Sequence, residues 1–265
     1  MNDPVNILNY AKITKRDYTL NDIDHRTPRL FIDHPLTPAG EVPLDRDQSH
    51  YLTTVLRLKS GDPIKIFNGV DGEWRATVNR QDKRSASLSI TDQLRSQPGQ
   101  PDIDFLFAPL KQARLDYVVQ KAVEMGANRI IPVMTRHTQV TRINSERMRA
   151  NAIEGAEQCG ILHVPAIGDA ISFSALLSTW DPARTLIVCD EALTPESPLA
   201  TLKSIPKGPL AILIGPEGGF ADDERASLSR HERVIRLSLG PRILRADTAA
   251  VAAFALVQAT LGDWQ

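Results

Sequence analysis

The sequence predicts an α/β protein, in which a small β-barrel precedes a mostly parallel sheet covered by helices on both faces. Two observations predict the sheet. After residue 101, apolar segments of strand length alternate with longer segments of helical periodicity, and the strand segments are apolar at every position. A third observation predicts the barrel, because short alternating segments and turn residues fill the stretch 28–97.

The totals fit an ordinary globular protein. With 265 residues the chain can bury a sizeable core, and its net charge of −1 excludes a strongly basic body while leaving room for a local basic face. The only two cysteines, Cys159 and Cys189, lie outside any zinc-binding motif, which predicts a reducing compartment and no metal. No apolar run reaches the roughly 20 residues of a membrane helix, and no apolar signal-peptide core is present, so we expect a cytoplasmic protein that binds no membrane.

The barrel is expected to begin after an extension. Residues 1–27 show no apolar periodicity and are expected to form an extension outside the folded domains. Apolar and polar residues then alternate in three runs, which are 64–66, 74–78 and 86–90. One short helix, from Ser49 to Leu58, is expected to interrupt these strands and to end before Gly61.

The stretch 96–101 is a linker by composition, so the expected domains are 28–97 and 102–265. Strands of the second domain are expected at 105–108, 130–133, 186–189 and 210–214. Helices are expected at 115–125, at 146–159 and from Asp247 or Thr248 to about 261, where either side chain could cap the helix. This last helix is rich in Ala and Val, which predicts that it is buried or forms a subunit interface.

The strongest local signal follows the strand 210–214. The sequence Gly215-Pro216-Glu217-Gly218-Gly219 places three glycines and a carboxylate beyond a strand end, where ligands of parallel sheets bind. The loop lacks the dinucleotide pattern G-x-G-x-x-G, and the chain contains no Gly-Lys pair of a P-loop. A ligand loop of another class is therefore expected.

A second signal is the string Leu239-Gly240-Pro241-Arg242-Ile243-Leu244-Arg245, which runs into Asp247, Thr248 and Ala249. A strand is expected to end at Leu239. Taken alone, Arg245 and Asp247 could have a structural role, as a local salt bridge or a helix cap, as readily as a role in a functional site.

Together these two motifs resemble the signature of the RsmE family of SPOUT methyltransferases. Three further stretches resemble the same family: Gln120-Lys121-Ala122-Val123-Glu124-Met125-Gly126, Glu157-Gln158-Cys159-Gly160, and His50 with Val55-Leu56-Arg57-Leu58 and Gly61-Asp62. The resemblance covers about residues 28–265, and five motifs occur in the family's order.

The resemblance implies a SPOUT α/β-knot domain, with a deep trefoil knot, behind an N-terminal PUA-like RNA-binding β-barrel. It implies transfer of a methyl group from S-adenosyl-L-methionine, without a metal, to N3 of a specific uridine of small-subunit ribosomal RNA (1498 in 16S numbering). The assembled 30S particle is the expected substrate. A homodimer, in which the partner subunit completes each active site, is also implied.

The site residues follow from the matched motifs. Main-chain groups around both motifs are expected to bind the cofactor, with contributions from Leu213, Gly215, Pro216, Glu217, Gly218, Gly219, Leu237, Leu239, Gly240, Ile243, Leu244 and Thr248. Uracil N3 carries a weakly acidic proton, so the site must remove it or stabilise the anion. Arg245 is expected to stabilise negative charge on a uracil oxygen, and Glu217 and Asp247 are candidates for a base or for orienting one.

N3 lies on the pairing edge of uracil, so the target must be unpaired. Expected phosphate contacts come from Arg29, Arg57, Arg75, Lys83 and Arg136. Three positions depart from the family: Ile161 replaces the usual Arg, Asp247 the frequent Glu, and Ala221 the usual Ser or Thr, for which Asp222 could take over the capping.

Three other interpretations stay open from the sequence. The first is a SPOUT methyltransferase with another RNA target, such as a transfer RNA base or a ribose hydroxyl. The second is a non-catalytic RNA-binding or ribosome-assembly factor that keeps the fold, which binding of S-adenosylmethionine would distinguish. The third, an unrelated α/β enzyme that binds phosphate in the glycine loop, is disfavoured by the missing P-loop lysine.

Overall fold

The computed structural model describes residues 26–80, 85–99, 102–193 and 197–264. The expected extension, apart from residues 26 and 27, and the expected RNA contact Lys83 lie outside these residues. The chain divides into two compact units, residues 1–100 and 101–265. Each unit is described by itself below.

The N-terminal unit is built around a five-stranded sheet. Its strands are β1 (Arg29–Phe31), β2 (Glu41–Pro43), β3 (Pro63–Phe67), β4 (Glu73–Arg80) and β5 (Ala86–Arg95). They lie in the order β1-β3-β4-β5-β2, with β1 and β3 parallel and the other pairs antiparallel.

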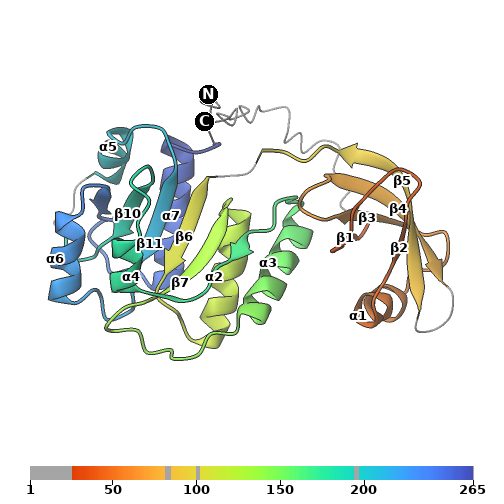
Figure 1. The fold of residues 1–265 in the computed structure, drawn as a ribbon, viewed down its shortest axis with the longest axis horizontal. Helices are drawn as coiled ribbons and strands as arrows, with labels where there is room; N and C mark the ends of the chain where they lie inside the picture. The colour runs from red at the N-terminus through yellow and green to blue at the C-terminus, as the bar shows by residue number, and fades with distance from the viewer. Residues whose placement is uncertain (1–25, 81–84, 100–101, 194–196, 265) are drawn as a thin grey trace, which may run out of the picture. The chain divides into compact units, whose positions relative to one another are not determined.

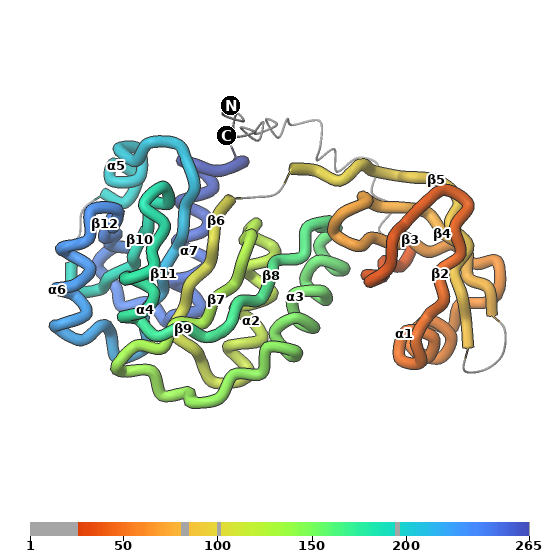
Figure 2. Tube along the Cα trace, in the orientation of Figure 1, coloured from red at the N-terminus to blue at the C-terminus, as the bar shows by residue number. Residues whose placement is uncertain are grey.

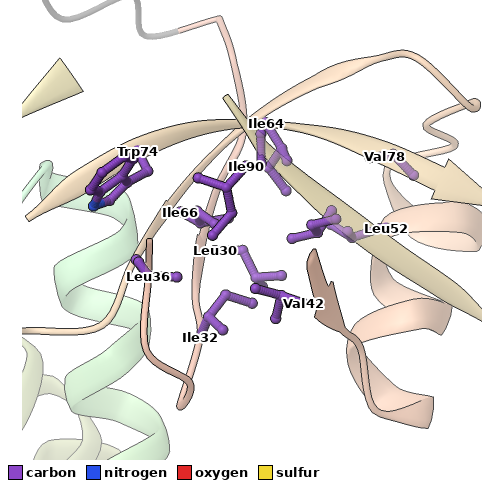
Figure 3. Close-up of a cluster of buried hydrophobic side chains, with 12 residues drawn as sticks. Leu30, Ile32, Leu36, Val42, Leu52, Ile64, Ile66, Trp74, Val78 and Ile90 are labelled. Carbon is purple, nitrogen blue, oxygen red and sulfur yellow. The ribbon is translucent and has the colours of Figure 1, made fainter. Parts of the chain in front are cut away.

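One face of this sheet carries the core that the alternation predicts. Ile64 pairs with Ala76, and Val78 pairs with Leu88; all four side chains are buried. Figure 3 shows the side chains of this cluster pointing toward one another, with Leu52 entering from the helical segment. The period-two pattern of the sequence therefore marks the buried face of the sheet.

The predicted helix from Ser49 to Leu58 is wrong in its bounds. Helix α1 (Arg46–His50) begins three residues earlier, and the π-helix η3 (Tyr51–Val55) continues it. The earlier start has a local cause. The Asp45 carboxylate accepts from the Gln48 backbone N–H at 2.7 Å, and the Gln48 side chain accepts from the Asp45 N–H at 3.2 Å, which is a capping box.

The C-terminal unit contains a seven-stranded, entirely parallel sheet (Figure 1). Its strands are β6 (Ile103–Phe107), β7 (Arg129–Met134), β8 (Ala166–Ile167), β9 (Ile171–Ser172), β10 (Thr185–Cys189), β11 (Leu210–Ile214) and β12 (Val234–Leu237). Their order is β12-β10-β11-β6-β7-β8, and β9 pairs with β7 as well. The strands expected from the sequence are present, and the apolar runs are buried as predicted.

Helices cover both faces of this sheet, as predicted. They are α2 (Gln112–Glu124), α3 (Ser145–Cys159), α4 (Phe173–Ser178), α5 (Pro198–Lys203), α6 (Asp222–Arg230) and α7 (Ala246–Thr260). On one face Leu106 belongs to a core with Phe173 of α4 and Leu228 of α6. On the other face Phe105 contacts Phe254 of α7, with ring centroids 5.4 Å apart. Figure 2 shows the path of the backbone through these strands and helices in the same orientation.

Three local predictions near the glycine loop and the last helix are wrong. The strand before the second motif ends at Leu237, because the chain leaves the sheet after its pairing with Cys189. Helix α7 has Arg245 in the cap position, without a side-chain cap, so neither Asp247 nor Thr248 caps it. Asp222 is the first residue of α6, and the Glu224 carboxylate accepts from the Ala221 N–H at 2.9 Å instead.

In the part of the chain that the structure describes, no helix is long and apolar enough to cross a membrane. The trefoil knot stays a prediction from the resemblance, since the strand order and pairings do not define the threading.

Candidate functional site

The strand order places the candidate site at one edge of the C-terminal sheet. The chain runs from β6 outward to β7 and β8, and then returns on the other side of β6 to form β10, β11 and β12. Because all of these strands are parallel, the segments that follow β6, β10, β11 and β12 emerge at the same edge. Such a switch in strand order is where open parallel sheets bind ligands.

A cavity of about 490 Å³ opens at this edge, within the size range of small-molecule sites. Four segments line it. They contribute Arg114 from α2; Cys189 at the end of β10 with Asp190, Glu191 and Leu193 after it; Ile214 at the end of β11 with Gly215, Pro216 and Glu217 after it; and Leu239 to Ala246 with Ala249 before and within α7. The cavity therefore joins both sequence motifs.

The glycine loop is held in its path by close packing. A β-carbon on Gly215 would lie 2.8 Å from the ring of Phe220, and one on Gly219 would overlap the Glu191 carboxylate. Gly219 also has φ +69°, a conformation that favours glycine. Its carbonyl accepts a hydrogen bond from Nδ1–H of His137 at 2.9 Å. These contacts fix main-chain groups at the edge of the cavity.

Asp190 ties the loop after β10 to β12. The residue is buried, and its carboxylate accepts from Nε of Arg236 at 3.0 Å and from the Ala192 N–H at 3.0 Å. Its own N–H donates to the carbonyl of Leu237 at 3.1 Å. A charged pair with backbone partners at a strand end stabilises the shape of the cavity wall.

Cys189 lines the cavity but offers no nucleophile. Burial, together with the neighbouring charge of Asp190, raises the pKa of its thiol to about 12. The thiol is therefore protonated at neutral pH and behaves as an apolar wall.

The cavity holds three guanidinium groups in two different situations. Arg114 forms an ion pair with Glu217. Arg242 and Arg245 are exposed, and neither makes an ion pair with any residue that the structure describes. Two cations are thus available to a negatively charged partner at the mouth of the cavity.

The predicted site residues fall into two groups. Gly215, Pro216, Glu217, Leu239, Gly240, Ile243, Leu244 and Arg245 line the cavity. Leu213, Leu237, Gly218, Gly219, Thr248 and Asp247 do not: the two leucines are buried in the strands, and Thr248 and Asp247 lie on the first turn of α7. The Asp247 carboxylate accepts from the Thr248 N–H at 2.9 Å, which is a local role.

Sequence reasoning missed Arg114, Asp190 and Glu191. Asp190 and Glu191 directly follow the strand 186–189, and a polar pair beyond a buried parallel strand is a usable signal. Arg114 gave no signal, because its place beside the glycine loop depends on β6 and β11 being neighbours.

The expected RNA contacts of the N-terminal unit differ in their surroundings. Arg29 is largely buried, donates to Glu73 at 2.7 Å and lies 4.5 Å above the ring of Phe67. Burial works to raise the pKa of Glu73, but hydrogen bonds from Arg95 and Arg29 outweigh it and hold that pKa below its ordinary value. This environment favours a structural role for Arg29.

The other expected contacts are exposed. Arg75 lies 3.5 Å from Asp92, and Arg136 of the C-terminal unit lies 2.7 Å from Asp223. Arg57 has φ +58°, a conformation that is uncommon for a residue with a side chain. Among the described residues it has no ion-pair partner, so its guanidinium is available to a phosphate.

An apolar surface continues from the cavity along α7. Ile243 is 89% exposed, and Val251, Ala252, Ala255 and Leu256 are only partly covered. Uncovered apolar side chains on a helix of this composition are typical of an interface between subunits.

The side chains of the described residues include no group of three or more His, Cys, Asp or Glu that could hold a metal ion.

Two family models match the chain. The RNA methyltransferase domain matches residues 98–258, and the RNA methyltransferase PUA domain matches residues 44–91. The chain is 33% identical over 232 residues to the Ribosomal RNA small subunit methyltransferase E of Rickettsia conorii, covering 87% of this chain and 94% of that protein. It is 28% identical to the protein of the same name from Bacillus subtilis, covering 86% and 95%.

Solved structures share the fold. A methyltransferase from Legionella pneumophila, solved in complex with S-adenosylmethionine, is 28% identical with a TM-score of 0.77, covering 88% of this chain and 98% of that one. A Ribosomal RNA small subunit methyltransferase E from Neisseria gonorrhoeae is 24% identical with a TM-score of 0.80, covering 90% and 100%, and is similar in fold.

Proposed function

Because this chain belongs to the Ribosomal RNA small subunit methyltransferase E family of RNA methyltransferases, we propose that it transfers a methyl group from S-adenosylmethionine to small-subunit ribosomal RNA. The proposed acceptor is N3 of a specific uridine, the one at 1498 in 16S numbering. The observation that carries the proposal is the cavity at the strand ends, lined by both the glycine loop and the Leu239–Arg245 segment.

The residues of the cavity fit the methyl donor. Apolar side chains of Leu193, Ile214 and Ala249 can cover an adenine ring, while main-chain groups of the glycine loop and of the Leu239–Arg245 segment line the cavity and can hydrogen-bond to a nucleoside. The relative from Legionella pneumophila that was solved with S-adenosylmethionine supports the same ligand for this chain. When bound, the sulfonium supplies an electrophilic methyl group.

In the proposed reaction the N3–CH₃ bond forms as the S–CH₃ bond breaks, and the N3 proton passes to water or to a base. The chain's main task is then to stabilise the uracil anion and to orient it. Arg245 is the proposed anion-stabilising group, since it lines the cavity and its side chain makes no ion pair with a described residue.

Neither Glu217 nor Asp247 is well placed to act as a general base. Glu217 lines the cavity but is already paired with Arg114, and Asp247 is absent from the lining. Stabilisation of the anion by Arg245 therefore accounts for catalysis better than direct proton removal by either carboxylate.

The acceptor uridine must be unpaired when it reacts, because N3 lies on its pairing edge. We propose that the N-terminal unit binds RNA phosphates, with Arg57 as its foremost contact and Arg75 as a second. The assembled 30S particle is the proposed substrate. An enzyme acting on ribosomes would work in the cytoplasm, and that location is part of the proposal.

We also propose that the protein acts as a homodimer. The support is the apolar surface formed by Ile243 and the outer face of α7, which adjoins the cavity. A partner seated there would cover these side chains and lie next to Arg242 and Arg245.

The test is methyl transfer from labelled S-adenosylmethionine to ribosomal particles that lack the modification. Intact small subunits and naked transfer RNA are compared, and the product is mapped by nuclease digestion and mass spectrometry. Label appearing as 3-methyluridine in small-subunit RNA alone is expected. Label in transfer RNA, or in another nucleoside, would replace the proposed target, and no label despite binding of the donor would refute the proposed substrate.

A further inference from the structure

The ion pair between Arg114 and Glu217 points to a receptor for a zwitterion. We propose that the two side chains together bind the amino-acid end of S-adenosylmethionine, with Arg114 holding its carboxylate and Glu217 its ammonium group. This inference rests on the proposed function, because it divides the same cavity into an adenosyl part and an amino-acid part.

The pair lies where two neighbouring strands end. Arg114 is in the first turn of α2, which follows β6, and Glu217 is in the loop that follows β11. The two strands pair in register from Ile103 to Phe107, and the Ala108 N–H extends the pairing by donating to the Ile214 carbonyl at 2.9 Å. Both side chains line the cavity, and they are 37% and 48% exposed. A bound ligand can therefore reach both charges.

Among the charged residues that line the cavity, Arg114 and Glu217 are the pair that can bind a zwitterionic ligand. Of the three carboxylates in the lining, Asp190 and Glu191 are paired with Arg236 and Arg225, which lie outside the lining. Arg242 and Arg245 have no carboxylate partner among the described residues. Within the part of the chain that the structure describes, Arg114 and Glu217 are thus the one ion pair with both members in the cavity wall.

This arrangement is complementary to the ligand's charges. The amino-acid end of S-adenosylmethionine is neutral overall but carries one charge of each sign. Neither Arg114 nor Glu217 has a second charged partner among the described residues, so guanidinium nitrogens and carboxylate oxygens remain for a carboxylate and an ammonium. The two unpaired arginines suit the polyanionic RNA instead.

An exposed ion pair contributes little to folding, about 0–1 kcal/mol. Its position in the cavity wall is therefore better explained by binding than by stability. It follows that Glu217 is a binding residue for the donor, and that the cavity should discriminate between adenosyl ligands by their amino-acid end.

The experiment measures, by calorimetric titration of the full chain, the affinity of each of three ligands for the unmodified protein and for each side-chain variant. The ligands are S-adenosylhomocysteine; S-adenosyl-3-thiopropylamine, which lacks only the carboxylate; and 5′-methylthioadenosine, which lacks both charged groups. The variants are Arg114→Gln and Glu217→Gln. Lys111→Ala is the matched control, because it removes an exposed cation at the start of the same helix, outside the main cavity.

In the unmodified protein, removal of the ligand carboxylate should weaken binding about tenfold or more. In Arg114→Gln this difference should vanish, while the affinity for 5′-methylthioadenosine stays unchanged. In Glu217→Gln the affinity for S-adenosyl-3-thiopropylamine should fall to that for 5′-methylthioadenosine. Lys111→Ala should reproduce the unmodified protein with all three ligands.

Equal affinity of the unmodified protein for all three ligands would overturn the inference, even if a variant failed to fold. The inference would also be overturned if Arg114→Gln bound S-adenosylhomocysteine normally but transferred the methyl group to RNA poorly. That result would show that Arg114 contacts the RNA and not the donor. Binding of none of these ligands by the unmodified protein would instead contradict the proposed function itself.

Discussion

Asp190 and Arg236 join the ends of two neighbouring strands beneath the candidate site. The buried carboxylate of Asp190 accepts from Nε of Arg236 at 3.0 Å and from Nη2 at 2.5 Å, so the guanidinium binds it through two nitrogens. Asp190 follows β10 and Arg236 belongs to β12, and both segments lead into the cavity wall. The geometry of the cavity therefore depends on an ion pair between a fully buried carboxylate and a largely covered guanidinium.

Replacement of Asp190 by Ala should destabilise the C-terminal unit. The change leaves Arg236 without its main partner and the Ala192 N–H without an acceptor, and the expected loss is about 2–4 kcal/mol of unfolding free energy. Urea unfolding measures it. Glu191→Ala is the control, since its exposed pair with Arg225 should change stability by under about 1 kcal/mol. Equal effects of the two changes would contradict this account of the wall.

Two glycines with positive φ should respond differently to alanine. Gly219 has φ +69° and faces the end of the flexible Glu191 side chain, so Gly219→Ala combines backbone strain in the glycine loop with displacement of that carboxylate from Arg225 and should weaken donor binding about tenfold or more. Gly240 has φ +100° but no atom within 4 Å of the added carbon, so Gly240→Ala should show only the strain, about 1–2 kcal/mol in stability. Calorimetric titration with S-adenosylhomocysteine distinguishes them, and tight binding by Gly219→Ala would refute the role of the loop.

The stability of the N-terminal unit should depend on pH through Glu73. Its pKa in the folded state is below its ordinary value, so the charged pair with Arg29 and Arg95 stabilises the fold above that ordinary value. This contribution is lost as pH falls through the lowered folded-state pKa. Glu73→Gln should reduce stability at pH 7 and flatten the decline toward acid, measured by urea unfolding across pH.

Asp92→Asn serves as its control, because the Asp92 pair with Arg75 is half exposed and should contribute little at any pH. An unchanged acid profile in Glu73→Gln would show that another carboxylate governs the acid response.

The sequence allowed prediction of the parallel sheet, the glycine loop and the residues 239–245, since buried strands and glycines leave local patterns. The cavity partners of these motifs could not be predicted in the same way. Arg114 meets Glu217 only because β6 and β11 are neighbours, and strand order is a property of the whole sheet.

Two other differences have separate reasons, one local in the sequence and one not. The capping box of Asp45 and Gln48 was present in the sequence and fixes the start of α1, but the π-helix that follows has no comparable pattern. The sequence predicts Arg29 as a phosphate contact, but its side chain is largely buried. Its burial depends on Glu73, 44 positions later, which β3 and β4 bring beside it.

We propose that the cavity transfers a methyl group to RNA with Arg245 stabilising the uracil anion. The most direct test is the single-turnover rate of methyl transfer to small ribosomal subunits, at saturating S-adenosylmethionine, for the unmodified protein and for Arg245→Ala. We expect a fall of about 10²–10³-fold in rate, with unfolding free energy and donor affinity unchanged. A near-normal rate in a folded Arg245→Ala protein would contradict the account.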